Sequence, residues 1–225
     1  DLGESAPSAP FVWRDQFFIP SRSSLITFEF SSSPSLGRRV PLDELGTPKH
    51  FAPLGDKLVV WGDQGVATLA EDGFLEILDS GFKSAKGSLL VEGPESVLAY
   101  LPGAPAQALL VGTDSKVSKL DSSSLPGQAE YGLYAENFVL IGGNILCYLV
   151  GGEVRKVELP TLVVTEPVFD HLENRLILLL SDGSARTCSP QGERFSFLCD
   201  LGGTPSTPPL RLGDQLVYGI EGRYL

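Results

Sequence analysis

Short runs of apolar residues, each ended by glycine or aspartate, recur along this chain in a fixed order. One such unit reads GDKLVVWGDQGVATLAEDGFLEIL over residues 55–78, and similar units begin near residues 93, 135, 173 and 213. The units share the order of a continuous apolar run, a tight turn, a second apolar run, a glycine turn and a more alternating run, and the one near residue 213 ends with the sequence before this order is complete. The pattern predicts short β-strands joined by tight turns, because glycine and aspartate tolerate the positive φ that such turns need.

The first apolar residue of each continuous run marks the repeat. These six positions are Phe17, Leu58, Val97, Phe138, Leu176 and Leu216. Their separations are 41, 39, 41, 38 and 40 residues, so the period is about 40. We expect four strands per unit, with the marked run as the second strand. That run is apolar throughout, as in residues 176–180, which suits a middle strand covered on both faces.

Four-stranded units of ~40 residues are typical of β-propeller blades, whose sheets stack radially and bury their faces against one another. The prediction is an all-β chain with little helix: one domain over residues 1–225, a six-bladed β-propeller of four-stranded blades with one blade incomplete. The repeat resembles those of the quinoprotein-dehydrogenase-like (PQQ-like) propellers and, more distantly, WD40 propellers. The pattern that carries the resemblance is Gly55-Asp56-Lys57-Leu58-Val59, repeated as Gly213-Asp214-Gln215-Leu216-Val217.

The chain departs from both families at residues that they use. A PQQ-like docking repeat needs a tryptophan near the end of each blade, and this sequence has only Trp13 and Trp61. The WD dipeptide and the Gly-His pair of WD40 repeats are absent. The resemblance therefore implies a superfamily fold and does not imply a quinone cofactor.

The two ends of the chain match each other. Residues 1–17 align without a gap on residues 200–216, with six identities at an offset of 199. Six periods need ~240 residues, and the chain has 225; the shortfall corresponds to the end of one third strand and its fourth strand. Two alternatives follow: a six-bladed ring whose missing strand is supplied elsewhere, or a slice of a longer array. Since methionine is also absent, we expect a portion of a longer polypeptide.

Charge and composition exclude some partners. The chain carries 17 Lys and Arg against 28 Asp and Glu, a net charge of −11. Nucleic acids and anionic membranes attract basic groups, so neither is expected as a partner. No apolar run approaches the ~20 residues that span a bilayer, and membrane insertion is not expected.

The three cysteines, Cys147, Cys188 and Cys199, are too few and too odd in number for a disulfide framework. We expect all three to be buried small residues. This mildly favours a cytoplasmic location, although removal of a leader would also be compatible with a periplasmic or extracellular one.

Catalytic and cofactor motifs are not found in the sequence. The only histidines, His50 and His171, are far apart and have no ligand-spaced partners, so no metal site is predicted. No G-x-S-x-G elbow occurs, and Gly142-Gly143-Asn144 joins two strands rather than opening a phosphate-binding helix. The sequence analysis therefore predicts no cofactor and no enzyme.

What remains is the surface formed by the loops. The loops from the fourth strand of one blade to the first strand of the next, and the turns between second and third strands, line one face of a propeller. Candidate partner- or ligand-binding residues are Arg22, His50, Phe51, Asp63, Pro102, Pro105, Asp170, His171 and Arg211. The preferred hypothesis is a non-catalytic scaffold that binds a protein partner or another domain of its own polypeptide. The alternatives are a sensor that binds a small ligand at the channel mouth and, less favoured, a PQQ-type or hydrolytic enzyme domain.

Overall fold

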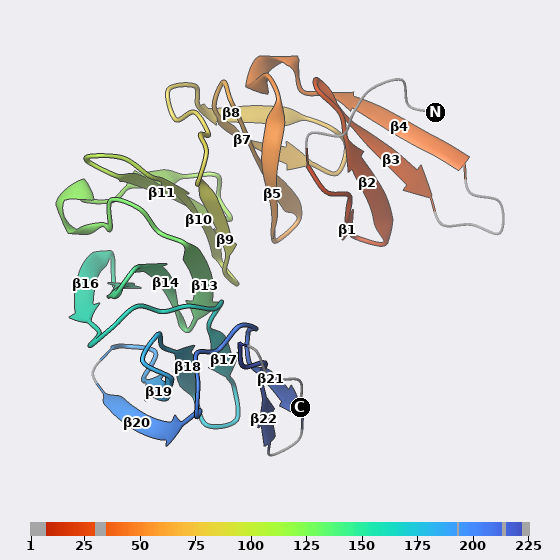
Figure 1. Cartoon of the computed structure of the whole chain (residues 1–225). Helices are drawn as coiled ribbons and strands as arrows, with labels where there is room; N and C mark the ends of the chain where they lie inside the picture. The colour runs from red at the N-terminus through yellow and green to blue at the C-terminus, as the bar shows by residue number, and fades with distance from the viewer. Residues whose placement is uncertain (1–7, 30–34, 193, 213–214, 222–225) are drawn as a thin grey trace. The chain divides into compact units, whose positions relative to one another are not determined.

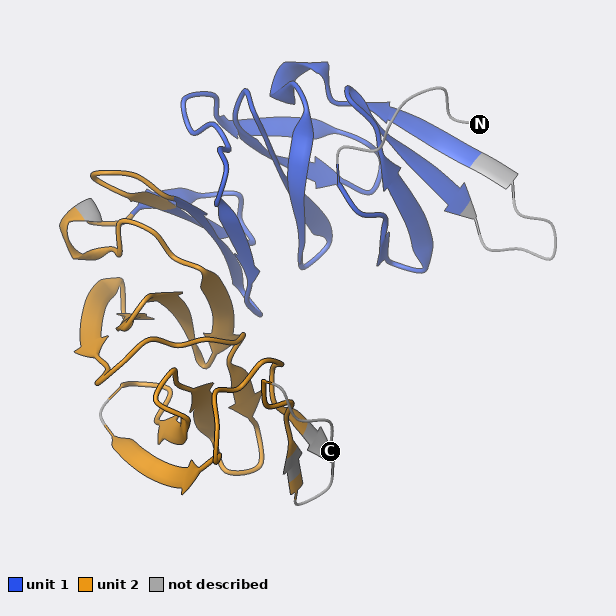
Figure 2. Ribbon diagram, in the orientation of Figure 1, with its two compact units in different colours: residues 1–101, 109–119 blue, residues 102–108, 120–225 orange. Residues whose placement is uncertain are grey.

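The regular structure of the chain is almost entirely β-strand (Figure 1). The computed structural model describes residues 8–29, 35–192, 194–212 and 215–221. These residues form five four-stranded antiparallel sheets and one two-stranded sheet. The chain divides into two compact units (Figure 2), unit 1 with residues 1–101 and 109–119 and unit 2 with residues 102–108 and 120–225.

Unit 1 contains three sheets, and in each the strands follow one another in chain order. The first sheet has β1 (Phe11–Trp13), β2 (Gln16–Pro20), β3 (Ser24–Glu29) and β4 (Ser35–Pro41). A single 3-10 turn, η1 (Asp43–Leu45), leads to the second sheet, with β5 (Pro48–Leu54), β6 (Lys57–Gly62), β7 (Val66–Ala70) and β8 (Leu75–Asp79). The third sheet has β9 (Leu89–Glu92), β10 (Ser96–Leu101), β11 (Gln107–Gly112) and β12 (Val117–Lys119).

Unit 2 continues the same pattern after the 3-10 turn η2 (Ser122–Ser124). The fourth sheet has β13 (Tyr131–Ala135), β14 (Asn137–Gly142), β15 (Ile145–Val150) and β16 (Glu153–Glu158). The fifth has β17 (Val168–Asp170), β18 (Arg175–Leu179), β19 (Ser184–Cys188) and β20 (Phe195–Asp200). The sixth is described as a pair, β21 (Leu210–Leu212) and β22 (Gln215–Val217).

The predicted repeat is confirmed at the level of strands. The six marked residues fall in β2, β6, β10, β14, β18 and β22, each the second strand of its sheet. A backbone hydrogen bond recurs between the turn that follows this second strand and the loop that leads into the same sheet. Gln64 donates its backbone N–H to the Leu45 carbonyl, as Ser181 does to Leu162 and Glu221 to Thr204, at 3.0, 2.9 and 3.0 Å.

The second strands are buried because they lie between two neighbouring sheets. In β6, Leu58 and Val60 pack into a core with the first sheet, whereas Val59 and Trp61 pack into a core with the third. All four side chains are 0% exposed. Alternate side chains of a strand point to opposite faces, so a fully apolar strand serves two cores at once.

Strand β18 of unit 2 is buried in the same way. Leu176 and Leu178 face the fourth sheet, in a core that includes Tyr148. Ile177 and Leu179 face the other way, where Tyr218 packs against them. The Tyr148 hydroxyl donates to the Cys188 sulfur at 3.0 Å inside this core, and burial raises the pKa of the phenol.

The number of blades and the two ends of the chain remain untested by the described residues. The six-bladed ring remains a prediction, because the described residues form five four-stranded sheets and one pair. The strands expected after residue 221 and the match at residues 1–7 lie outside the described residues.

The expectation for the cysteines is wrong at one position, because Cys199 is exposed on β20 while the other two are buried. Burial raises the pKa of Cys147 to about 11. All three thiols are free.

Within the described part of the chain, no helix is long and apolar enough to cross a membrane.

Candidate functional site

Two predicted site residues, His50 and Phe51, lie in strand β5 and not in a loop as expected. The His50 ring packs on Trp61, with centroids 5.5 Å apart, and Phe51 stacks on Phe11 at 4.8 Å. Burial, and secondarily the charge of Lys49, lowers the pKa of His50. Both rings therefore take part in packing within unit 1.

Two predicted aspartates hold the backbone of their turns. Asp63 accepts a hydrogen bond from the Thr47 backbone N–H at 3.0 Å. Asp170 ends β17 and is 3% exposed; its carboxylate accepts the Leu172 backbone N–H at 3.1 Å and lies 3.6 Å from the Arg175 guanidinium. These contacts assign both carboxylates to local structure.

The other predicted loop residues are scattered over the sheets. Arg22 is exposed in the β2–β3 turn, and Pro105 is exposed in the β10–β11 loop, which also contains the partly buried Pro102. That loop is tethered by a 2.9 Å bond from the Gly103 backbone N–H to the Gly127 carbonyl. Arg211 lies in β21, but its side chain is outside the described part of the structure.

His171 does line a pocket, which we call the His171 pocket. It is an open hollow of about 500 Å³ in unit 2, between the β13–β14 turn and the β17–β18 turn. Its lining residues are Tyr134, Glu136, Phe169, His171 and Asn174. The sequence analysis assigned His171 to the loops between blades; it lies instead in the turn between the first two strands of the fifth sheet, at the opposite edge from those loops.

The aromatic wall of this pocket is held by neighbouring rings. Phe169 contacts the His171 imidazole edge to face, with centroids 4.6 Å apart and an interplanar angle of 78°. Tyr134 meets Phe138 in the same manner at 5.2 Å. Phe138 is only 6% exposed, so the Tyr134 ring packs against a buried side chain.

Two polar residues of the pocket have an unusual backbone. Glu136 and Asn174 have φ values of +59° and +47°, in the left-handed region that favours glycine. At the corresponding turn of the second sheet the chain has Gly55, with φ +58°. A glutamate in this conformation costs about 1 kcal/mol or more, whereas asparagine adopts it more readily. Such outliers concentrate at functional sites. The chain thus carries a carboxylate and an amide where glycine would be less strained.

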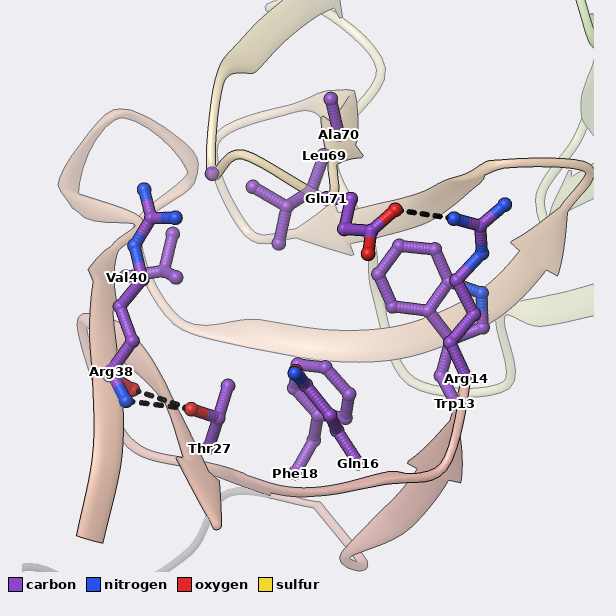
Figure 3. A pocket seen from close by; sticks show the side chains of 11 residues that line it. Trp13, Arg14, Gln16, Phe18, Thr27, Arg38, Val40, Leu69, Ala70 and Glu71 are labelled. Atoms are coloured by element: carbon purple, nitrogen blue, oxygen red, sulfur yellow. Dashed lines mark hydrogen bonds and ion pairs between the residues drawn. The ribbon is translucent and has the colours of Figure 1, made fainter. Parts of the chain in front are cut away.

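A second pocket lies in unit 1, and we call it the Arg38 pocket. This cavity of about 200 Å³ is enclosed by the first sheet and the turn from β7 to β8. Figure 3 shows Arg38 on one side and the Arg14–Glu71 ion pair on the other, above the rings of Trp13 and Phe18. Arg14 also has a left-handed backbone, with φ +48°.

Sequence reasoning missed every residue of the Arg38 pocket and all but one of the His171 pocket. Both hollows lie beside turns between first and second strands, at the opposite ends of the sheets from the loops in which the candidate residues were predicted. A usable signal was present: glycine stands in the β5–β6 turn at Gly55, and the related turns carry Arg14 and Glu136 instead.

No group of three or more His, Cys, Asp or Glu that could hold a metal ion occurs among the residues that the structure describes. The sequence matches no protein family model. It also matches no curated protein.

Solved structures similar to this chain are β-propeller proteins. A streptogramin B lyase is 11% identical with a TM-score of 0.57, over 94% of this chain and 76% of the lyase. YCF48 bound to D1 peptide is 11% identical with a TM-score of 0.58, over 86% of this chain and 67% of that chain. PorZ, a surface component of the type-IX secretion system of Porphyromonas gingivalis, has a TM-score of 0.60 at 11% identity, over 98% of this chain and 32% of PorZ.

The comparisons correct one expectation of the sequence analysis. The sequence predicts no enzyme, and this prediction is contradicted, because structures similar to this chain include lyases and the fold can therefore be catalytic. A virginiamycin B lyase from Staphylococcus aureus is 10% identical with a TM-score of 0.56, over 88% of this chain and 72% of the lyase. At these identities the likeness shows the fold alone: this chain has the all-β fold of β-propeller proteins.

Proposed function

We propose that this chain is a β-propeller interaction module that binds a protein partner, and that the His171 pocket receives a cationic side chain of that partner. The observation that carries the proposal is Glu136, whose backbone lies in the left-handed region at the rim of an aromatic hollow that Asn174 also lines. The strain has no role in closing the turn, because glycine fits it better. It is explained if the carboxylate and the amide are needed for binding.

The chemistry of the pocket suits a lysine or arginine side chain. Tyr134 and Phe169 line it with aromatic rings, and a cation over the face of such a ring gains about 0.5–2 kcal/mol. Among the described residues, the partner found for the Glu136 carboxylate is the neutral side-chain amide of Gln191, which donates to it at 3.1 Å. No cation of the described residues is paired with that carboxylate, so it is open to a cation of a partner.

The charge of the whole chain favours the same kind of partner. A net charge of −11 attracts basic surfaces over distances comparable with the Debye length of ~8 Å and speeds their encounter. One protein of similar fold, YCF48, is bound to a peptide in its solved structure. This likeness supports peptide binding by the fold, while the choice of a cation rests on the pocket itself.

The test uses the two histidines as internal probes. The protein is titrated with the peptide acetyl-GGSKGS-amide and with its neutral match acetyl-GGSQGS-amide, and the imidazole resonances are followed by NMR. We expect the lysine peptide to shift the resonances of His171, at the pocket, and to leave those of His50, packed on Trp61 in unit 1, unchanged. Equal shifts with the glutamine peptide, or shifts of both histidines alike, would contradict the proposal.

A second candidate function is acid–base catalysis in the same pocket. The specific observation is that an imidazole and a carboxylate, from His171 and Glu136, line one open hollow in a fold that lyases also use. Such a pair can move a proton between substrate atoms that lie between them. Incubation with quinupristin, found bound to an inactive H270A virginiamycin B lyase, tests this function by mass spectrometry. Turnover that is lost in His171→Ala would favour the enzyme over the interaction module.

A further inference from the structure

The Arg38 pocket has a rigid apolar floor. Trp13, Phe18 and Leu69 are 7%, 3% and 2% exposed and belong to the core between the first two sheets of unit 1. The rings of Trp13 and Phe18 lie 5.8 Å apart at an angle of 46°. Because these side chains are fixed by the core, the floor presents a constant shape to anything that enters the cavity.

The rim of the pocket contains two cations from the first sheet, Arg14 in the β1–β2 turn and Arg38 in β4. Arg38 starts from a fixed point on β4, since its backbone N–H donates to the Thr27 hydroxyl at 2.7 Å and its carbonyl accepts from the same hydroxyl at 3.1 Å. Its guanidinium lies against Gly73, where a Cβ atom would stand 2.0 Å from Nη2 and 2.5 Å from Cζ. Glycine is therefore required in the β7–β8 turn if Arg38 is to keep this position.

The two arginines differ in their partners. Arg14 forms an ion pair with Glu71 across the cavity, and its guanidinium lies 5.7 Å from the centre of the Trp13 ring. Over the described residues, no carboxylate is within ion-pair distance of the Arg38 guanidinium. The pocket therefore has two guanidinium groups, one carboxylate and a net charge of +1, inside a chain whose net charge is −11.

A local positive charge over an aromatic floor selects a monovalent anion with an apolar or planar body. The cavity of about 200 Å³ has room for about six water molecules at ~30 Å³ each, which is the size of a single ligand side chain. A guanidinium matches a carboxylate with two parallel hydrogen bonds. The negative Glu71 opposes a dianion such as phosphate more strongly than a carboxylate.

We propose that the Arg38 pocket is a second binding site, which takes a carboxylate of a peptide on the Arg38 guanidinium while the adjoining side chain of the peptide packs on Trp13 and Phe18. The carboxylate comes from the end of a peptide or from an aspartate or glutamate side chain. The site is independent of the His171 pocket, because all of its residues belong to unit 1.

The experiment reads the site through its own tryptophan. Protein labelled with 5-fluorotryptophan gives two fluorine resonances: Trp13 reports on the pocket, and Trp61, 0% exposed in the core, serves as the reference. Three peptides are titrated: acetyl-GGSGGF with a free carboxyl end, the same peptide amidated, and amidated acetyl-GGSGEF. We expect the free-acid peptide to shift the Trp13 resonance and the amidated one to leave it in place. If the glutamate peptide also shifts the Trp13 resonance, the pocket accepts side-chain carboxylates as well as the carboxylate at a chain end.

The matched variants are Arg38→Gln and Arg39→Gln. Both remove one cation from β4, but Arg39 lies on the other face of the strand, where it donates to the Ser24 hydroxyl at 2.8 Å. We expect Arg38→Gln to weaken binding of the free-acid peptide about tenfold or more, the scale of one lost charge-assisted contact, and Arg39→Gln to change it less than twofold. An unchanged Trp61 resonance shows that each variant is folded.

The proposal is overturned if no acidic peptide moves the Trp13 resonance, if the amidated peptide moves it equally, or if the two variants bind alike. The conservative variant Arg38→Lys keeps the positive charge but cannot form two parallel hydrogen bonds to a carboxylate, so it separates the contribution of charge from that of bidentate hydrogen bonding. A partial loss supports bidentate recognition, while full retention would show that charge alone is sufficient and would overturn the forked geometry. None of these results bears on the His171 pocket.

Discussion

Replacing Trp61 with phenylalanine removes one polar group from the centre of unit 1. The indole N–H donates to the Phe82 carbonyl at 2.7 Å, and the two rings stack with centroids 5.0 Å apart at 13°. Trp61 is 0% exposed and Phe82 is 4% exposed, so water does not replace the lost donor without a rearrangement. Phenylalanine keeps a six-membered ring in the stack but lacks the five-membered ring and its N–H.

The expected loss of stability has two parts. A buried carbonyl left without its donor costs about 1–3 kcal/mol. The lost contacts of the missing ring atoms add about 1 kcal/mol, on the scale of ~0.8 kcal/mol per buried methylene-sized group. We therefore expect the free energy of unfolding of unit 1 to fall by about 2–4 kcal/mol.

The assay follows urea unfolding by tryptophan fluorescence. Both tryptophans of the chain lie in unit 1, so the signal reports this unit alone, and in Trp61→Phe the remaining Trp13 reports it. The matched control is Phe74→Leu, at a ring that is 66% exposed, for which a change within about 0.5 kcal/mol is expected. A loss below about 1 kcal/mol in Trp61→Phe, or one equal to that of the control, would refute the buried hydrogen bond and the double-sided core around β6.

Three further predictions concern other groups. Because burial lowers the pKa of His50 below 6.5, the unfolded chain binds this proton more readily than the folded one. Stability that is present above pH 6.5 is therefore lost as the pH falls, and partial exposure of the ring keeps this loss small. Urea midpoints at pH 7.5 and 5.5 should show a smaller difference in His50→Gln than in the parent. Gly142→Ala, whose Cβ would stand 2.0 Å from the Gln128 carbonyl oxygen, should lower the unfolding midpoint of unit 2, whereas Gly127→Ala, with 3.4 Å to its nearest atom, should change it little. Ellman's reagent should titrate one thiol, the exposed Cys199, in the folded protein and all three after unfolding; rapid reaction of all three in the folded state would contradict the buried positions of the other two.

The strand pattern could be predicted because each strand obeys its local sequence. The continuous apolar runs at Leu58 and Leu176 became second strands buried on both faces, and the alternating run near Val154 became an outer strand. Turns with glycine, such as the one at Gly65 with φ +153°, fell between the expected strands. These features depend on residues adjacent in sequence, and each is supported by its recurrence in six repeats of about 40 residues.

The sites could not be predicted in the same way because they depend on side chains from different sheets. His171 has no neighbour in sequence that marks a pocket; its partners Tyr134 and Glu136 precede it by more than thirty residues. His50 was expected in a loop, but Pro48–Leu54 extends as a strand and carries the imidazole onto Trp61. Likewise Arg14 and Glu71 meet only because the β7–β8 turn packs beside the first sheet of unit 1.

The account rests most on the claim that the Glu136 carboxylate is kept, against its backbone strain, to bind a cation. The direct measurement is the dissociation constant of acetyl-GGSKGS-amide for Glu136→Gln, compared with Glu153→Gln, an exposed carboxylate on strand β16 of the same unit. The account predicts about a tenfold or greater weakening for the first variant, with folding intact, and less than a twofold change for the second. Equal affinities in the two variants would contradict it.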